Sequence, residues 1–201
     1  MDRFEEPPID YSEDDDDDED EEEKEKEKEK EKNELKIEKF SILSDNPITL
    51  INFNKIILQD LIGQGGFGKV YRAILKGQTV AVKEPIYYAS SKIKSINQEI
   101  IDEASLQFQL DHHNIIQLYG ISFQNEKVYL IMEYASGGSL HELIRQRTLS
   151  PNVIIKFAIQ IASAMQYLHS FTPKAIIHRD LKSPNSEYSV QMFTFLMFFP
   201  L

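Results

Sequence analysis

The chain has 201 residues, of which 41% are apolar, and this composition allows one folded domain with a tail. Its net charge of −11 is unevenly distributed, because residues 1–39 hold 21 acidic and 8 basic residues, a balance of −13, and residues 40–201 therefore carry +2. A nearly neutral folded part gives no support for nucleic-acid binding, and the lack of cysteine excludes disulfides and thiolate metal sites.

Residues 1–39 form an acidic, low-complexity tail. From Glu13 to Lys32 only Asp, Glu and Lys occur, so no apolar side chain offsets the entropy cost of ordering, and we expect disorder. An acidic interaction tail, or phosphorylation at Ser12, is the functional alternative to a solvated spacer. Because the N-terminus lacks the basic-then-apolar order of a secretory signal, we expect a cytoplasmic or nucleocytoplasmic protein.

Residues 40–55 form a lead-in segment, in which β-branched and apolar residues return at Ile48. A glycine-rich turn between two strand-like runs follows this segment. The turn is Ile62-Gly63-Gln64-Gly65-Gly66-Phe67-Gly68-Lys69-Val70. Glycines let backbone N–H groups approach phosphates closely, so the turn suits a nucleotide. A dinucleotide-binding fold is the alternative, since Glu84 follows Gly63 by 21 residues, although the β-type residues after Gly68 count against it.

The next elements are a strand and a helix. Residues 78–83 alternate with a period of two, which places Ala81 and Lys83 on one face. Between residues 90 and 110 apolar residues recur at helical spacing, and this predicted helix carries both Glu99 and Glu103. The periodicity does not choose between the two acids.

Two further strands are predicted at residues 115–123 and 128–134, joined by a polar turn. Ser150 and Pro151 then have the types expected at a helix start, with apolar residues at helical spacing up to Leu168. The chain continues into Ile176-Ile177-His178-Arg179-Asp180-Leu181-Lys182-Ser183-Pro184-Asn185. Here a two-residue apolar strand end would anchor a loop in which an acid, a base and an amide converge, an arrangement suited to phosphoryl transfer.

Residues 178–185 match every fixed position of H-R-D-L-x-x-x-N, so the chain resembles the protein kinase family. The glycine-rich turn, the sequence Val80-Ala81-Val82-Lys83 and residues 131–140 occur in the family's order. Lys182, two residues after Asp180, and the sequences L-K-S-P-N and G-G-S-L are similar to those of the tyrosine-kinase-like group of Ser/Thr kinases. The resemblance implies an α+β protein-kinase-like fold over residues 56–185, with a five-stranded antiparallel sheet, one main helix and an incomplete helical lobe.

The resemblance also implies roles for single residues. Asp180 would be the base for a Ser or Thr hydroxyl of a protein substrate, Lys182 would steady the phosphoryl group, and Asn185 would bind Mg²⁺. In the family's register Glu103, rather than Glu99, pairs with the phosphate-binding Lys83. The implied ATP-binding residues are Ile62, Gly63, Gln64, Gly65, Gly66, Phe67, Gly68, Lys69, Val70, Ala81, Lys83, Glu103, Met132 as gatekeeper, Glu133 and Ala135.

The resemblance stops after Asn185. No Asp-Phe-Gly follows, and residues 186–201 end in an apolar run that is too short for a membrane helix of about 20 residues. A truncated domain with little activity of its own is therefore expected, since a kinase also holds Mg²⁺ through the Asp of that triplet. A non-catalytic module that binds ATP or a partner, and an unfolded fragment, are the alternatives.

Overall fold

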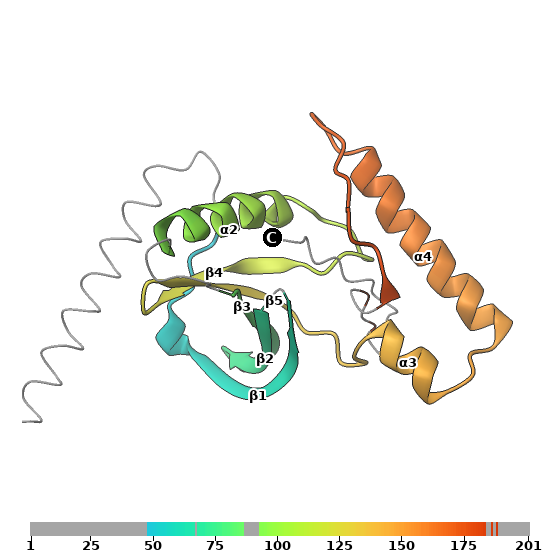
Figure 1. Ribbon diagram of the computed structural model, residues 1–201, viewed down its shortest axis with the longest axis horizontal. Coiled ribbons are helices and arrows are strands. Elements are labelled where there is room, and N and C mark those ends of the chain that lie inside the picture. Colours follow the sequence, from blue (N-terminus) through green and yellow to red (C-terminus); the bar gives the residue numbers. More distant parts are fainter. Residues whose placement is uncertain (1–47, 67, 87–92, 184–185, 187, 189–201) are drawn as a thin grey trace, which may run out of the picture. The chain divides into compact units, whose positions relative to one another are not determined.

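The computed structural model describes residues 48–66, 68–86, 93–183, 186 and 188. A short 3-10 turn precedes five strands and three helices of this part of the chain (Figure 1). In chain order these are η1 (Phe53–Lys55), β1 (Ile56–Gly65), β2 (Gly68–Leu75), β3 (Gln78–Glu84), α2 (Ile93–Phe108), β4 (Leu118–Gln124), β5 (Lys127–Glu133), α3 (Leu140–Gln146) and α4 (Pro151–His169).

The five strands form one sheet in the order β1-β2-β3-β5-β4, and every neighbouring pair is antiparallel. Two of the connections are two-residue turns in which both residues have positive φ, Lys76-Gly77 between β2 and β3 and Asn125-Glu126 between β4 and β5. Such turns match the twist of antiparallel strands. The predicted α+β fold, with a five-stranded antiparallel sheet and one main helix beside it, is confirmed.

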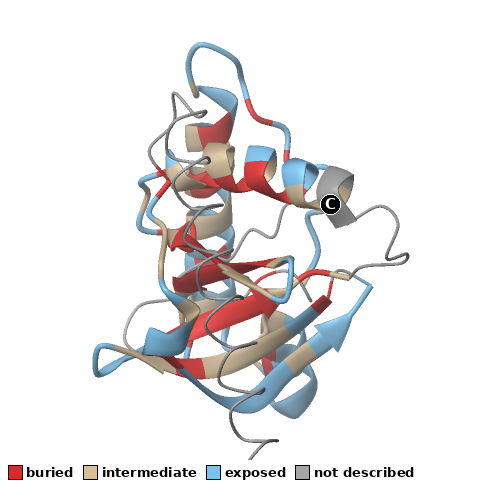
Figure 2. Cartoon of the chain, turned by 90° about the vertical axis from the view of Figure 1, so that its left-hand side faces the viewer, coloured by how far each residue is buried: buried red, intermediate tan, exposed pale blue. Residues whose placement is uncertain are grey.

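The two faces of the sheet have different surroundings. One face carries an apolar cluster, against which Ile51 and Phe53 pack. The cluster consists of Ile56, Ala73, Val80, Val82, Tyr129 and Ile131. Strand alternation places Ala81 and Lys83 on the other face. Helix α2 packs on β4 and β5, with Ile100 and Ala104 buried. Figure 2 shows buried segments in both the helices and the sheet. Lys83 therefore lies on the face opposite the Val80–Val82 cluster, as its alternation predicts.

The segment before β1 is part of the folded unit. Ile121 in β4 donates to the Thr49 carbonyl at 3.0 Å and accepts from the Ile51 amide at 2.8 Å, so residues 49–51 extend the sheet beyond β4. The neighbouring Gly120 is required by this approach, because a Cβ at that position would lie 2.2 Å from the Thr49 carbonyl oxygen. Residues 49–51 thus protect the β4 edge of the sheet.

Helix α4 packs against the residues that follow α2 and against Ile176, which precedes the predicted catalytic loop, residues 178–185. Leu168 and Ala164 of α4 form a buried cluster with Leu110, Ile115 and Ile176. The helix begins at Pro151 as predicted, but the Ser150 side chain makes no capping hydrogen bond. The predicted position of the cap is therefore correct, but the side-chain hydrogen bond expected of a cap is not formed. The Ser150 backbone carbonyl accepts from the amides of Val153 and Ile154.

Helix α3 was not predicted. It is held by a capping box, in which the Ser139 hydroxyl accepts from the Glu142 amide at 3.2 Å and the Glu142 carboxylate accepts from the Ser139 amide at 3.3 Å. The strand predicted to begin at Ile115 begins instead at Leu118, because Ile115 packs into the α4 cluster.

Candidate active site

The glycine-rich turn is a β-hairpin formed by the end of β1 and the start of β2. Gly63 pairs with Val70, Gln64 with Lys69, and Gly65 with Gly68. A Cβ at Gly65 would meet nothing within 4 Å, and the same is true at Gly66, so the tip of the hairpin borders open space. Phe67, one of the predicted nucleotide-binding residues, lies outside the described part of the chain.

Gly68 is the glycine that the backbone requires. Its φ is +125°, and a Cβ there would lie 2.1 Å from the carbonyl oxygen of Glu84, the last residue of β3. The close approach fixes the hairpin against the strand that carries Lys83, since Val70 pairs directly with Lys83. Ile62, before the turn, exposes 44% of its surface, which leaves it accessible to a ligand.

The ammonium group of Lys83 lies in the interior, with 3% of the residue exposed. Burial lowers the pKa of Lys83, while the Glu103 carboxylate acts in the opposite direction. Burial likewise raises the pKa of Glu103 to about 7, and Lys83 counteracts that rise. The two residues therefore interact across the space between β3 and α2, whereas Glu99, one helical turn earlier, is exposed.

The predicted adenine-facing residues lie on β3 and at the end of β5. Ala81 pairs with Met132, and Met132 in turn pairs with Leu118 of β4. Ala81 and Met132 are buried, as is Ala135 just after the strand. The Glu133 amide donates to the Gln117 carbonyl at 2.9 Å, which fixes the backbone at this point.

The predicted catalytic loop is organised around His178, which is 1% exposed. The Asp180 amide donates to the His178 carbonyl at 2.9 Å and contacts its Nδ1 at 3.2 Å. Burial lowers the pKa of His178, and a neutral ring can accept that contact. Arg179, between the two residues, has a φ of +65°, which gives a tight turn. The buried His178 ring and the two contacts from the Asp180 amide hold this turn and fix the position of Asp180.

Asp180 is ion-paired with Lys182, with 2.8 Å between Oδ2 and Nζ. The Ser186 hydroxyl donates to the Lys182 carbonyl at 3.0 Å and so fixes the loop after the pair. The structure thus brings together Lys83 with Glu103 and Asp180 with Lys182. Asn185, the predicted Mg²⁺ ligand, lies outside the described residues.

Two features of this loop differ from expectation. The predicted strand end is not a strand, and only Ile176 anchors it, by burial and by donating to the Leu168 carbonyl at 2.9 Å. Ile177 is 66% exposed, because α4 offers a partner to one side of the segment alone. The sequence analysis also did not predict that His178 holds the turn before Asp180. The position of this polar ring directly after two apolar residues, Ile176 and Ile177, could have indicated that it is buried.

The described residues fit a nucleoside polyphosphate. They offer a buried lysine on one face of the sheet, and the hairpin tip is open where a Cβ would find no neighbour. The small Ala81 side chain lies beside the buried Met132, on the same face of β3 as Lys83. For Mg²⁺ the predicted ligand is Asn185, whose amide oxygen suits that ion and which lies outside the described residues.

Comparison with known proteins gives the same class as this geometry. Residues 56–187 match the model of the protein kinase domain. Over 135 residues the chain is 42% identical to mitogen-activated protein kinase kinase kinase 10 of Homo sapiens, and over 139 residues it is 40% identical to mitogen-activated protein kinase kinase kinase 11 of Homo sapiens. A mitogen-activated protein kinase kinase kinase of Drosophila melanogaster is 38% identical over 151 residues.

The chain belongs to the protein kinase family. Its similarity to these relatives agrees with the resemblance to the tyrosine-kinase-like group. The matches cover 67%, 69% and 75% of this chain but only 14%, 16% and 13% of the relatives, respectively, so the chain spans a small part of their length. None of the helices in the described residues is both long and apolar enough to cross a bilayer.

Proposed function

We propose that this chain carries the nucleotide-binding lobe and the catalytic loop of a serine/threonine protein kinase. The observation that carries the proposal is the buried Lys83, which β3 places beside the glycine hairpin by pairing it with Val70. The tip of that hairpin is open, and the Glu103 carboxylate of α2 acts on the same ammonium group. Burying a lysine costs free energy, and the Glu103 carboxylate offsets part of that cost. Such a lysine at the base of a glycine hairpin is a candidate site for an anion, and family membership supports ATP as its source.

In this proposal each described residue has a separate task. Lys83 holds the α and β phosphates, Glu103 holds Lys83, and the hairpin backbone from Gly63 to Val70 covers the nucleotide. Ala81 and Met132, with the backbone from Glu133 to Ala135, contact the adenine. When bound, Mg²⁺ would neutralise the charge of the phosphates, and Asn185 would hold it.

Asp180 and Lys182 act on the acceptor side. Asp180 accepts the proton of the substrate hydroxyl, and the turn held by His178 fixes its position. Lys182 lies 2.8 Å from Asp180, close enough to place its ammonium beside the transferred group. Lys182 lies two residues after Asp180, and this position is one of those at which the chain resembles Ser/Thr kinases. It therefore supports Ser and Thr, rather than Tyr, as the residues that accept the phosphate.

The test is phosphate transfer from ATP to a mixed protein substrate, followed by phosphoamino-acid analysis. It uses the longest product of the gene that contains residues 56–188. We expect phosphoserine and phosphothreonine, and loss of most transfer in Lys83→Met, with nucleotide binding retained in part. The matched control is Lys127→Met, since Lys127 belongs to the same sheet but is ion-paired with Glu84 at 3.0 Å. Equal transfer by both variants, or mainly phosphotyrosine, would contradict the proposal.

A second candidate is a module that binds ATP or a partner without transferring phosphate. The observation in its favour is that no Asp-Phe-Gly triplet occurs in the 201 residues. Both candidates predict nucleotide binding that requires the hairpin. They differ in the transfer assay, where the non-catalytic module gives no signal that depends on Asp180.

A further inference from the structure

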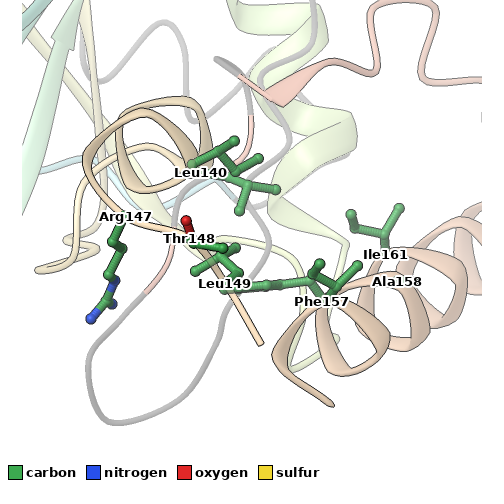
Figure 3. Close-up of a pocket in the computed structure, with 9 residues that line it drawn as sticks. Leu140, Arg147, Thr148, Leu149, Phe157, Ala158 and Ile161 are labelled. Carbon is green, nitrogen blue, oxygen red and sulfur yellow. The ribbon is translucent and has the colours of Figure 1, made fainter. Parts of the chain in front are cut away.

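A groove between α3 and α4 has no role in the proposed function. It encloses about 530 Å³ and is bordered by both helices and by the segment that joins them (Figure 3). Its lining residues are Leu140, Ile144, Arg147, Thr148, Leu149, Ile154, Phe157, Ala158 and Ile161. On α4 the members follow the spacing i, i+3, i+4 and i+7, which forms one apolar stripe.

The chemistry of the groove is almost entirely apolar. Its one charged side chain, Arg147, points away from the aliphatic groups (Figure 3), and the Thr148 hydroxyl is the remaining polar group among the side chains that line it. Ile144 and Ile154 each expose 53% of their surface in the described structure. A groove of this kind, with apolar walls and no convergent polar groups, selects an uncharged apolar occupant.

The chain itself delivers such a segment to the rim of the groove. The Gly137 amide donates to the Tyr188 carbonyl at 2.8 Å, and the Tyr188 amide donates to the Gly138 carbonyl at 3.0 Å. The Tyr188 ring meets the ring of Phe157 edge to face, with 6.4 Å between centroids. Because Phe157 also lines the groove, the described chain ends beside it.

Residues 189–201 follow Tyr188 directly and lie outside the described structure. Nine of these 13 residues are Val, Met, Phe or Leu, and none is charged. An extended segment of 13 residues reaches about 43 Å, and a helix of 19 residues such as α4 is about 28 Å long, so the segment can cover the whole groove. We propose that residues 189–201 dock in the α3–α4 groove of their own chain.

The absence of cysteine and tryptophan from the sequence permits a direct test on the full 201-residue chain. A bimane label on Ala158→Cys, inside the groove, is combined with Phe195→Trp, whose indole quenches bimane on contact. We expect strong quenching that does not depend on protein concentration. The matched control is Ile159→Cys with the same tryptophan, because Ile159 is 63% exposed on the same helix and outside the groove, and it should show little quenching.

Charge substitution provides a second readout. Ile154→Glu places a carboxylate in the groove, and an unpaired buried charge should release the segment and speed its cleavage by chymotrypsin about tenfold or more. Ile155→Glu is the control, since Ile155 is the adjacent isoleucine, is 55% exposed and does not line the groove. Circular dichroism checks that both variants keep the helical content of the parent.

Three results would overturn the proposal. One is equal quenching at Ala158→Cys and Ile159→Cys, and another is equal cleavage of the two glutamate variants. The third is quenching between a labelled chain and a separate Phe195→Trp chain that rises with concentration, which would make a second copy the occupant. Concentration-independent quenching at Ala158→Cys alone, together with faster cleavage in Ile154→Glu alone, supports docking within one chain.

Discussion

The burial of Glu103, which outweighs the effect of the nearby Lys83, predicts a specific pH dependence of stability. The pKa of Glu103 is about 7 in the folded chain and 4.5 as an ordinary glutamate, so folding favours its protonated form. The stability that this group contributes is therefore fully present below pH 4.5, declines as the pH rises toward 7, and is lost above it. Glu103→Gln cannot ionise and should not show this decline.

The magnitude follows from the two pKa values. Each tenfold change in proton affinity corresponds to about 1.4 kcal/mol, so a fully shielded carboxyl would contribute about 3 kcal/mol. Glu103 keeps part of its surface in solvent, and screening reduces the expected contribution to about 1–2 kcal/mol. Relative to the parent, Glu103→Gln should therefore gain about 1–2 kcal/mol in the free energy of unfolding between pH 4.5 and pH 8.

The assay is urea unfolding of the 201-residue chain, followed by circular dichroism at several pH values in that range. Glu99→Gln is the matched control, because Glu99 is exposed on the same helix, and it should follow the parent within about 0.5 kcal/mol. Histidines with lowered pKa, such as His178, act in the opposite direction but are common to all three proteins and cancel in the differences. Parallel curves for the two variants, or a gain in Glu99→Gln alone, would refute the argument that burial raises the pKa of Glu103.

Three further predictions concern local geometry, each measured by denaturant unfolding. Gly68→Ala should lower the free energy of unfolding by about 1–3 kcal/mol, because an added Cβ meets the β3 backbone at a positive φ, while Gly65→Ala, whose Cβ enters open space, should cost much less. Gly120→Ala should displace the lead-in segment at a cost of about 1–3 kcal/mol, and amide exchange at Ile121 should then quicken; unchanged exchange would show that the contact with residues 49–51 is unimportant. Ser139→Ala should cost about 1 kcal/mol through loss of the α3 capping box, whereas the same change at Ser150, whose side chain makes no cap bond, should cost less.

The sequence predicted those parts of the site that depend on local periodicity. The alternation of residues 78–83 placed Ala81 and Lys83 on one face of β3, and the structure has them there, with Val80 and Val82 in the opposite cluster. The helical spacing of residues 93–108 predicted α2. Periodicity could not choose between Glu99 and Glu103, because residues four apart lie on the same side of a helix. That choice depends on the angle at which α2 meets β3.

The features that sequence reasoning missed depend on contacts between distant segments or on weak local signals. Gly120 is required by the Thr49 carbonyl, 71 positions earlier, and no local pattern reveals that approach. Ile177 looks like a core residue in the sequence, yet α4 covers Ile176 alone. Helix α3 could have been predicted, since Ser139 and Glu142 have the spacing of a capping box, but a helix of seven residues has too few turns for a clear period.

The central claim, that the loop around Asp180 serves phosphate transfer to serine and threonine, is tested most directly by Asp180→Asn. The measurement is incorporation of phosphate from ATP, with Mg²⁺, by the longest gene product that contains residues 56–188. Loss of the proton-accepting carboxylate should lower the rate about 10²–10⁴-fold while the fold and nucleotide binding persist. Asp111→Asn, an exposed acid before the His112 turn, should leave the rate unchanged. Transfer by Asp180→Asn at the rate of the parent would contradict the account.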